Sequence, residues 1–237
     1  MAVYNLGQMS PRPRSASDQD ILMAAFRAIA RLGPARLTLA DVARDVGVSP
    51  AAIVQRFGSK RALLLATAAD AAGGGQYIFP GLRARHRRPI DALLGLAECM
   101  TLLGTTPEAI ANNLVFFQVD LKDNEFHRHA LAASGGMRAG IKALIRDAVA
   151  AGELVRCDAS RLAAAVHATI NGSVLNWSVH REGSLVASVR RDLSTVLAPY
   201  RSVQGRRPKP RDSRPKTDVG SVPLRKRGQT PRRRPTS

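Results

Sequence analysis

The sequence predicts an all-α protein, from its composition, its hydrophobic periodicity and its capping residues. Hydrophobic residues make up 45% of the 237 residues, enough for a sizeable core, whereas aromatic residues make up only 4%. Alanine and leucine dominate the hydrophobic set, which favours helices over sheets. Apolar residues recur at helical spacing behind good capping residues, and no stretch rich in Val, Ile and Thr alternates like a half-buried strand.

Residues 38–60 contain a pair of short predicted helices. The apolar residues of the first helix recur at the spacing of one buried face: Leu39, Val42, Ala43 and Val46. Thr38 and Asp41 form a capping-box pattern at its start. Gly47 follows the last apolar residue, where it can adopt the left-handed conformation that ends a helix.

The second helix of this pair begins at Ser49. Ser49 is a good N-cap, and Pro50 occupies the first helical position, where its missing N–H costs nothing. Ile53 and Phe57 lie four residues apart, so both face inward. Together the two helices read as a helix-turn-helix, a motif whose second helix lies in the DNA major groove.

Two further helices complete the predicted N-terminal domain, residues 18–75. The first begins with the capping box of Ser17 and Asp20, and Gly33-Pro34 stops it. The last begins at Ser59 and ends near three consecutive glycines, residues 73–75. Residues 76–88 are turn-rich and basic, and we expect the domain boundary between about Gly73 and Arg88.

A second all-helical domain is predicted over residues 76–200. Five helices begin near Pro89, Pro107, Asp123, Asp158 and Ser184. The second of them has an apolar stripe that we expect to face the core, with Phe116 beside it: Ile110, Leu114, Phe117 and Leu121.

Both ends of the chain are predicted to be disordered, over residues 1–17 and 201–237. The net charge is +18, and residues 201–237 hold 13 of the 36 Lys and Arg residues but only 2 of the 18 Asp and Glu residues. This composition cannot bury enough apolar surface to fold. A basic balance favours nucleic acid or anionic surfaces. Arg12 and Arg14 near the N-terminus belong either to a solvated tail or to an arm that reaches phosphates or the minor groove.

Several other classes of protein are disfavoured. The N-terminus lacks the apolar segment of a signal peptide, and no apolar run reaches the length of a membrane span, so we expect a cytoplasmic protein. Cys99 and Cys157 are too few for a disulfide scaffold. His127 and His129 have no common metal-ligand spacing, and no nucleophile elbow or phosphate loop is present. We therefore expect no enzymatic activity, no catalytic residues, no metal and no cofactor.

The helix-turn-helix and its continuation resemble the TetR (tetracycline-repressor) family of one-component regulators. That family runs from a T-x-x-x-[IV]-A-x-x-x-G-[VL]-S helix-turn-helix into an aromatic residue, a short turn and a lysine that opens the next helix. The matching positions are Thr38, Val42, Ala43, Gly47, Val48, Ser49, Phe57 and Lys60. Helix pairs with a glycine turn occur in many proteins that never touch DNA, but the combination is specific. The close match covers about residues 18–72.

The resemblance implies DNA contacts at eight positions: Thr38, Ser49, Pro50, Ala51, Ala52, Gln55, Arg56 and Lys60. Thr38 and Lys60 would meet phosphates, while Gln55 can bond adenine through two hydrogen bonds. The methyl groups of Ala51 and Ala52 can pack on a thymine methyl.

Two arginines and a valine complicate this assignment. Arg56 is suited to a phosphate or to a guanine at the groove edge. Val54 stands where the family usually has tyrosine, and valine cannot hydrogen-bond a phosphate. Arg56 and Arg61 are candidates to replace that contact.

The resemblance also implies a homodimer and a small-molecule effector. In the family the last two long helices pair with their copies in a second subunit, here over about residues 160–200, with Leu193 and Leu197 expected in the interface. The preceding helices enclose a pocket, for which we expect Met100, Leu103, Phe117, Met137, His167, Asn171 and Trp177. His167 and Asn171 are either a polar anchor for the effector or a hydrogen-bonded core pair. Trp177 is expected in the interface or the pocket wall.

The expected function is transcriptional regulation by a dimer, most often a repressor in this family, that binds a palindromic double-stranded operator and is released by an effector. The alternative is an architectural protein that binds DNA independently of sequence through its basic tail.

Overall fold

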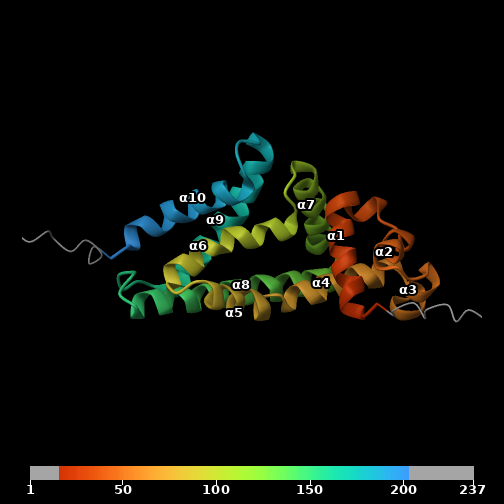
Figure 1. Ribbon diagram of the computed structural model, residues 1–237, viewed down its shortest axis with the longest axis horizontal. Coiled ribbons are helices and arrows are strands. Elements are labelled where there is room, and N and C mark those ends of the chain that lie inside the picture. The colour runs from red at the N-terminus through yellow and green to blue at the C-terminus, as the bar shows by residue number, and fades with distance from the viewer. Residues whose placement is uncertain (1–15, 203–237) are drawn as a thin grey trace, which may run out of the picture. The chain divides into compact units, whose positions relative to one another are not determined.

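The computed structural model describes residues 16–202, apart from the side chain of Asp120. This part of the chain contains helices and turns, with one isolated antiparallel bridge between Leu154 and Arg201 (Figure 1). The all-α class predicted from composition is therefore confirmed. No helix in residues 16–202 combines the length and the apolar character that crossing a membrane requires.

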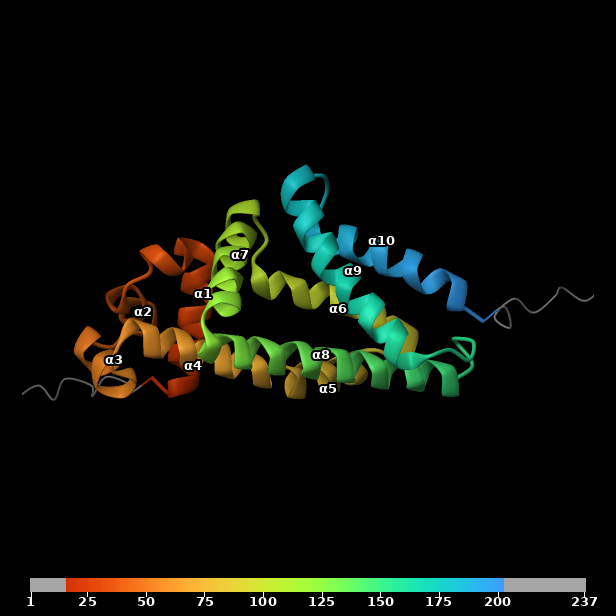
Figure 2. The same cartoon turned by 180° about the vertical axis from the view of Figure 1, so that it is seen from behind.

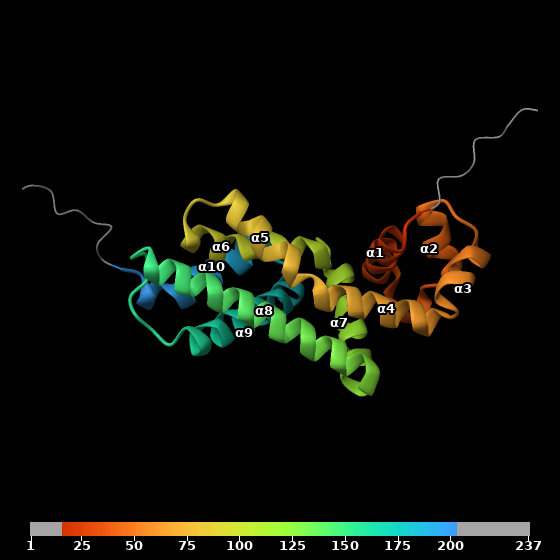
Figure 3. The same ribbon diagram turned by 90° about the horizontal axis from the view of Figure 1, so that it is seen from below.

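The first four helices follow the predicted order. They are α1 (Asp18–Arg36), α2 (Leu39–Val46), α3 (Pro50–Phe57) and α4 (Lys60–Gly73). Gly33 interrupts α1, as expected, because its φ of 76° is outside the helical range; one more helical turn then runs through Pro34. Helix α2 contacts both α1 and α3, and α4 crosses α1 (Figure 3).

Helix α5 (Gly75–Arg85) corrects the prediction of a turn-rich segment over residues 76–88. Gly73 ends α4 and Gly75 begins α5, so Gly74 alone separates the two helices, and Pro80 lies inside α5. Phe79 and Leu82 are buried, and a Cβ atom at Gly140 would lie 2.0 Å from the Phe79 ring. Burial of these two side chains therefore outweighs the low helix propensity of glycine and proline.

The remaining helices begin where their capping residues predicted. They are α6 (Pro89–Cys99), α7 (Pro107–Lys122), α8 (Asn124–Ala150), α9 (Ala159–His180) and α10 (Leu185–Leu197). Short 3₁₀ turns, η1 (Met100–Leu103) and η2 (Ala198–Tyr200), follow α6 and α10. Thr106, Asp123, Asp158 and Ser184 cap α7, α8, α9 and α10 through their side chains.

The predicted inward stripe of α7 is wrong at its C-terminal end. Ile110 is buried, but Phe117 and Leu121 are 50% and 58% exposed. Phe116 is the buried phenylalanine instead, because α7 packs against α1 along the face that carries Phe116. The sequence pattern could not show that α7 has two neighbours on different faces.

Two clusters of buried side chains form the interior. The larger joins α5, α6, α8, α9 and α10, and it also contains Met100 of η1, Ile110 of α7 and Leu154 of the loop before α9. The smaller lies among α1 to α4, and it also contains Phe116 of α7 and Phe126 of α8, whose rings meet edge to face with centroids 6.1 Å apart. Figure 2 shows α7 beside α1 and α8 beside α4. The core beneath the helix-turn-helix is therefore closed by residues from beyond the predicted domain boundary.

Polar contacts reinforce this junction. Arg61 at the start of α4 donates to Asp123 at 2.7 Å, pairs with Glu125 at 2.7 Å and lies over the Phe126 ring at 5.6 Å. The Asn112 side chain of α7 donates to the carbonyl of Ala30 at 2.9 Å. The described residues all belong to one compact unit, and the predicted division after residue 75 stays a prediction.

The first residues of the predicted C-terminal tail pair with the loop before α9. The amide of Val155 donates to the carbonyl of Tyr200 at 2.8 Å, and that of Ser202 donates to Glu153 at 3.0 Å. Ordered pairing thus extends two residues beyond the predicted tail boundary. Residues 203–237 lie outside the described residues, as do residues 1–15 of the predicted arm.

Replacing Phe126 tests how much the junction stabilises the fold. Phe126 is 2% exposed, so Phe126→Ala should lower the free energy of unfolding by about 3–5 kcal/mol in urea titrations. Phe117→Ala is the control, because this neighbouring phenylalanine is half exposed; it should cost about 1 kcal/mol or less. Equal losses in the two variants would contradict the assignment of Phe126 to the core.

Candidate nucleic-acid interface

The turn between α2 and α3 has the geometry that its glycine predicted. Gly47 adopts the left-handed conformation, with φ 72° and ψ 32°. The amide of Val48 donates to the carbonyl of Ala43 at 3.0 Å, which satisfies one of the last carbonyls of α2. Any other residue at position 47 would need a strained backbone, so the glycine fixes how α3 leaves α2.

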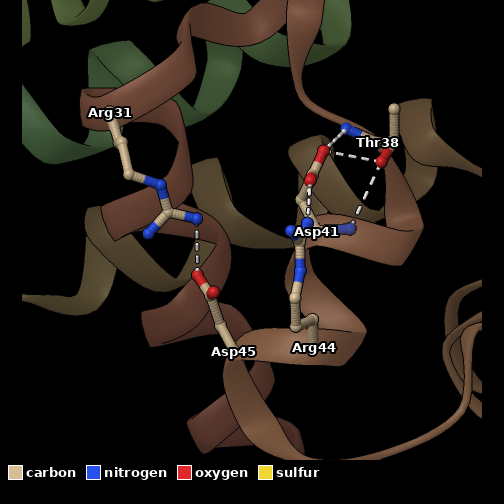
Figure 4. Close-up of polar contacts among 5 residues, drawn as sticks. All are labelled: Arg31, Thr38, Asp41, Arg44 and Asp45. Carbon is tan, nitrogen blue, oxygen red and sulfur yellow. Dashed lines mark hydrogen bonds and ion pairs between the residues drawn. The ribbon is translucent and has the colours of Figure 1, made fainter.

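A reciprocal capping box opens α2. The Thr38 amide donates to the Asp41 carboxylate at 3.0 Å, and the Asp41 amide donates to the Thr38 hydroxyl at 3.2 Å (Figure 4). The hydroxyl itself donates to the same carboxylate at 2.6 Å. The hydrogen bonds from Thr38, followed by the contact with Arg44, hold the pKa of Asp41 below its ordinary value. Thr38 thus has a structural role beside its predicted phosphate contact.

Helix α3 is anchored on one face and exposed on the other. Its N-cap Ser49 accepts a hydrogen bond from the Ala52 amide at 3.2 Å. Ile53 is fully buried. Of the predicted base-reading residues, Ser49, Pro50, Ala51 and Gln55 are exposed and Ala52 is half-buried. Side chains must be exposed in this way to contact base edges in the major groove.

The two cations assigned to DNA both have partners within the chain. Arg56 donates to the carbonyl of Ala16 and pairs with Asp18 at 3.5 Å. The ammonium of Lys60 donates to the carbonyl of Ala35 at 2.8 Å, which uses one of its three protons. Lys60 thus retains two donors for a phosphate, whereas Arg56 is directed at the start of α1. The DNA contacts of both residues stay predictions.

The sequence did not predict the ion pairs that join the helix-turn-helix region to other helices. Asp45 pairs with Arg31 of α1 at 2.9 Å and so ties α2 to α1 (Figure 4). Arg61, considered above as a phosphate ligand, instead meets Asp123 and Glu125. These partners lie 14 to 64 positions apart, and no local pattern marks them.

The seven residues predicted for the effector pocket differ in exposure. Met100 and Trp177 are buried, Leu103, Met137 and His167 are half-buried, and Phe117 and Asn171 are exposed. The Trp177 indole donates to the carbonyl of Gly183 at 3.1 Å. Burial, and then the nearby charge of Arg138, lower the pKa of His167 below its ordinary value, which favours the neutral imidazole. The pocket assignment stays a prediction.

Two open pockets occur among α8, α9 and α10. One, of about 310 Å³, lies between α9 and α10 and is lined by Thr169, Gly172, Ser173, Asn176, Asp192, Thr195 and Val196. The other, of about 430 Å³, lies between the end of α8 and the start of α9. Neither includes any of the seven predicted residues.

Two family descriptions match the chain in succession. "Bacterial regulatory proteins, tetR family" matches residues 21–67, which span α1 to α4. "BetI-type transcriptional repressor, C-terminal" matches residues 91–200. The chain belongs to the TetR family. No curated protein matches its sequence significantly.

Solved structures share the TetR fold with this chain at low sequence identity. A TetR transcription regulator from Haloarcula marismortui is 18% identical over 78% of this chain and 98% of that one, with a TM-score of 0.64. FadR from Bacillus subtilis, solved in complex with stearoyl-CoA, is 18% identical over 77% and 98%, with a TM-score of 0.57. SmeT, the repressor of the Stenotrophomonas maltophilia efflux pump SmeDEF, is 20% identical over 81% and 94%, with a TM-score of 0.56. The fold and family together establish DNA-binding transcriptional regulation as the class of function.

The capping box of this TetR-family regulator makes a measurable prediction. Thr38→Ala should lower the free energy of unfolding by about 1 kcal/mol at pH 7, and Thr38→Ser should restore most of it. Because the folded pKa of Asp41 is lowered, the contribution of this carboxylate is present above its ordinary value of 3.8 and is lost as the pH falls through the folded pKa. The difference between wild type and Thr38→Ala in urea titrations should therefore shrink below about pH 4. A difference that grows in acid would contradict this account of the cap.

Proposed function

We propose that this chain is a repressor that binds a palindromic operator as a homodimer and leaves it when a small molecule binds the C-terminal helices. The observation that carries the proposal is α3, which is anchored by Ile53 and presents Ala51 and Gln55 to solvent behind a rigid glycine turn. A short helix held in this way can enter a major groove. The BetI-type repressor match to residues 91–200 supports the repressor role.

The proposed dimer uses the outer face of α9. Ala165, Ala168 and Gly172 lie on one stripe of this helix, and their small side chains allow a second helix to approach closely. The same face continues into the hollow between α9 and α10, where the Ser173 hydroxyl donates to Asp192 at 2.7 Å. A dimer that binds a palindromic operator must place its two copies of α3 at half-sites about 34–36 Å apart.

The residues expected earlier to make this interface do not face outward. Leu193 and Leu197 are 0% exposed and belong to the core that α10 shares with α6 and α9. Aspartate at these positions would disrupt folding and would not report on assembly. The sequence pattern of α10 could not separate a core stripe from an interface stripe.

The proposed effector is a small molecule bound among η1, α7, α8 and α9. The half-buried side chains of Leu103, Met137 and His167 supply apolar surface and one polar group, the usual composition of a small-molecule site. FadR, which shares this fold, was solved in complex with stearoyl-CoA, and this supports the proposal that the present chain also binds a small molecule. An effector that prefers a different placement of α7 and α8 would move α1 and α4 with them.

Selection of bound fragments from genomic DNA, followed by footprinting, tests the function. A repressor of this kind protects a short palindrome. An architectural protein that binds through its basic tail would instead cover DNA without regard to sequence. Uniform coverage with no enriched fragment would contradict the proposal.

Base and phosphate contacts should respond differently to mutation. Gln55→Ala should relax the preference at one base pair per half-site, at a cost of about 1–3 kcal/mol, and should leave the salt dependence unchanged. Lys60→Ala should weaken binding to all sequences alike. Because a dimer loses two lysines, the slope of log K against log salt should shrink by about 2.

The measurement is a salt titration of both variants on the selected operator and on a scrambled duplex. If Lys60→Ala changes which sequences are bound but leaves the salt slope as it was, the proposed docking is wrong.

Assembly is tested by placing a charge on the α9 stripe. Ala168→Glu should give monomers that unfold as cooperatively as the wild type, because Ala168 is exposed in the single chain. Ala132→Glu is the matched control on the exposed surface of α8 and should stay dimeric. Sedimentation at micromolar concentration measures both. A dimer that survives Ala168→Glu unchanged would place the interface elsewhere.

A further inference from the structure

Val54 is an exposed apolar residue at the middle of the outward face of α3. It is 47% exposed, and it lies four residues after Pro50 and three after Ala51, so the three side chains share one helical face. Gln55 continues the same face. Valine is a weak helix former, and α3 has only eight residues. An exposed valine therefore contributes nothing to folding that alanine would not supply better.

The same face carries no charged group. Arg56 is the only charged residue within α3, and it lies two positions from Val54, on a different side of the helix. Its guanidinium is held by the Ala16 carbonyl and by Asp18 of α1. The next cation along the chain, Lys60, donates a hydrogen bond to the Ala35 carbonyl. The outward face of α3 thus presents methyl and methylene groups with a single amide.

This chemistry selects among base pairs. Guanine is usually recognised by arginine or lysine through bidentate hydrogen bonds, and this face carries neither residue. The apolar group that the major groove offers is the thymine methyl, while glutamine pairs with adenine. We propose that Val54, with Ala51 beside it, packs on a thymine methyl in each half-site, so that α3 reads A·T pairs at the centre of its contact. This inference rests on the proposed operator binding and specifies what that site recognises.

Replacement of thymine by deoxyuridine tests the inference, because it removes the methyl group and leaves base pairing intact. In the selected operator, deoxyuridine should weaken binding at one or two positions of each half-site. The loss should be about fourfold for each methyl, the effect of one buried CH₂-sized group, and about fifteenfold when both half-sites are changed together. Replacing guanine by 7-deazaguanine at the positions that this face contacts should have no effect, because the face carries no arginine or lysine to bond its N7.

The valine itself is tested by combining protein and DNA changes. Val54→Ala should weaken binding to the thymine operator and should lose most of the sensitivity to deoxyuridine at the contacted position. Val155→Ala is the matched control, because Val155 is a similarly exposed valine, 44% exposed, in the loop before α9. It should keep the wild-type ratio of affinities for the thymine and deoxyuridine operators. The thermal midpoints of both variants should match the wild type.

The outcomes separate the inference from the function beneath it. If the selection enriches no sequence, the proposed operator binding is wrong, and this inference with it. If an operator is found but deoxyuridine changes nothing, or Val54→Ala keeps the full deoxyuridine penalty, the inference alone is overturned. A loss of affinity with 7-deazaguanine in the contacted positions would also overturn it.

Discussion

The helix-turn-helix depends on a core that its own two helices do not complete. Helices α2 and α3 have eight residues each, too few for an isolated helix to persist in water. Their orientation comes from packing on α1 and α4, and the cluster beneath these helices is closed by Phe116 and Phe126. Both phenylalanines belong to helices that the family match assigns to the C-terminal region. Helices of the C-terminal region thus supply part of the core that α1 to α4 share.

Magnitudes show which contact at this junction matters most. Arg61 is about half exposed where it meets Asp123 and Glu125, and exposed ion pairs contribute about 0–1 kcal/mol. A buried phenylalanine contributes about 3–5 kcal/mol when compared with alanine. We therefore assign the strength of the junction to Phe126 and its register to Arg61 and Asn112. A displacement of α7 and α8 must then either carry α1 and α4 along or open a cavity, so the two groups of helices are mechanically coupled. The proposed effector would act through this coupling.

Local patterns in the sequence predicted most of the fold. The caps at Ser17, Thr38 and Ser49 and the glycine at 47 are read from neighbouring residues, and the structure confirms them. The errors arose where distant contacts decide the outcome. Helix α5 forms because Phe79 packs over Gly140, and α7 turns Phe116 rather than Phe117 inward because it has α1 as a neighbour.

The candidate site could be predicted only where local sequence patterns determine it. The exposed residues of α3 follow from the helix-turn-helix pattern, so Ala51 and Gln55 were accessible to sequence reasoning. The partners of Arg56 and Arg61 were not, because each is chosen by the packing of another helix. The sequence indicates only that Val54 cannot replace the phosphate contact of a tyrosine. Its uncharged surroundings depend on Arg56, which is hydrogen-bonded to Ala16 and paired with Asp18.

Native-state hydrogen exchange tests the shared core most directly, because it measures the free energy of opening at each amide. The account predicts that buried amides of α1 and α4 open with the same free energy and the same urea dependence as those around Phe116 and Phe126. These segments would then form one cooperative unit. Amides of α1 to α4 that open at distinctly lower free energy, while those around Phe116 and Phe126 stay protected, would contradict it.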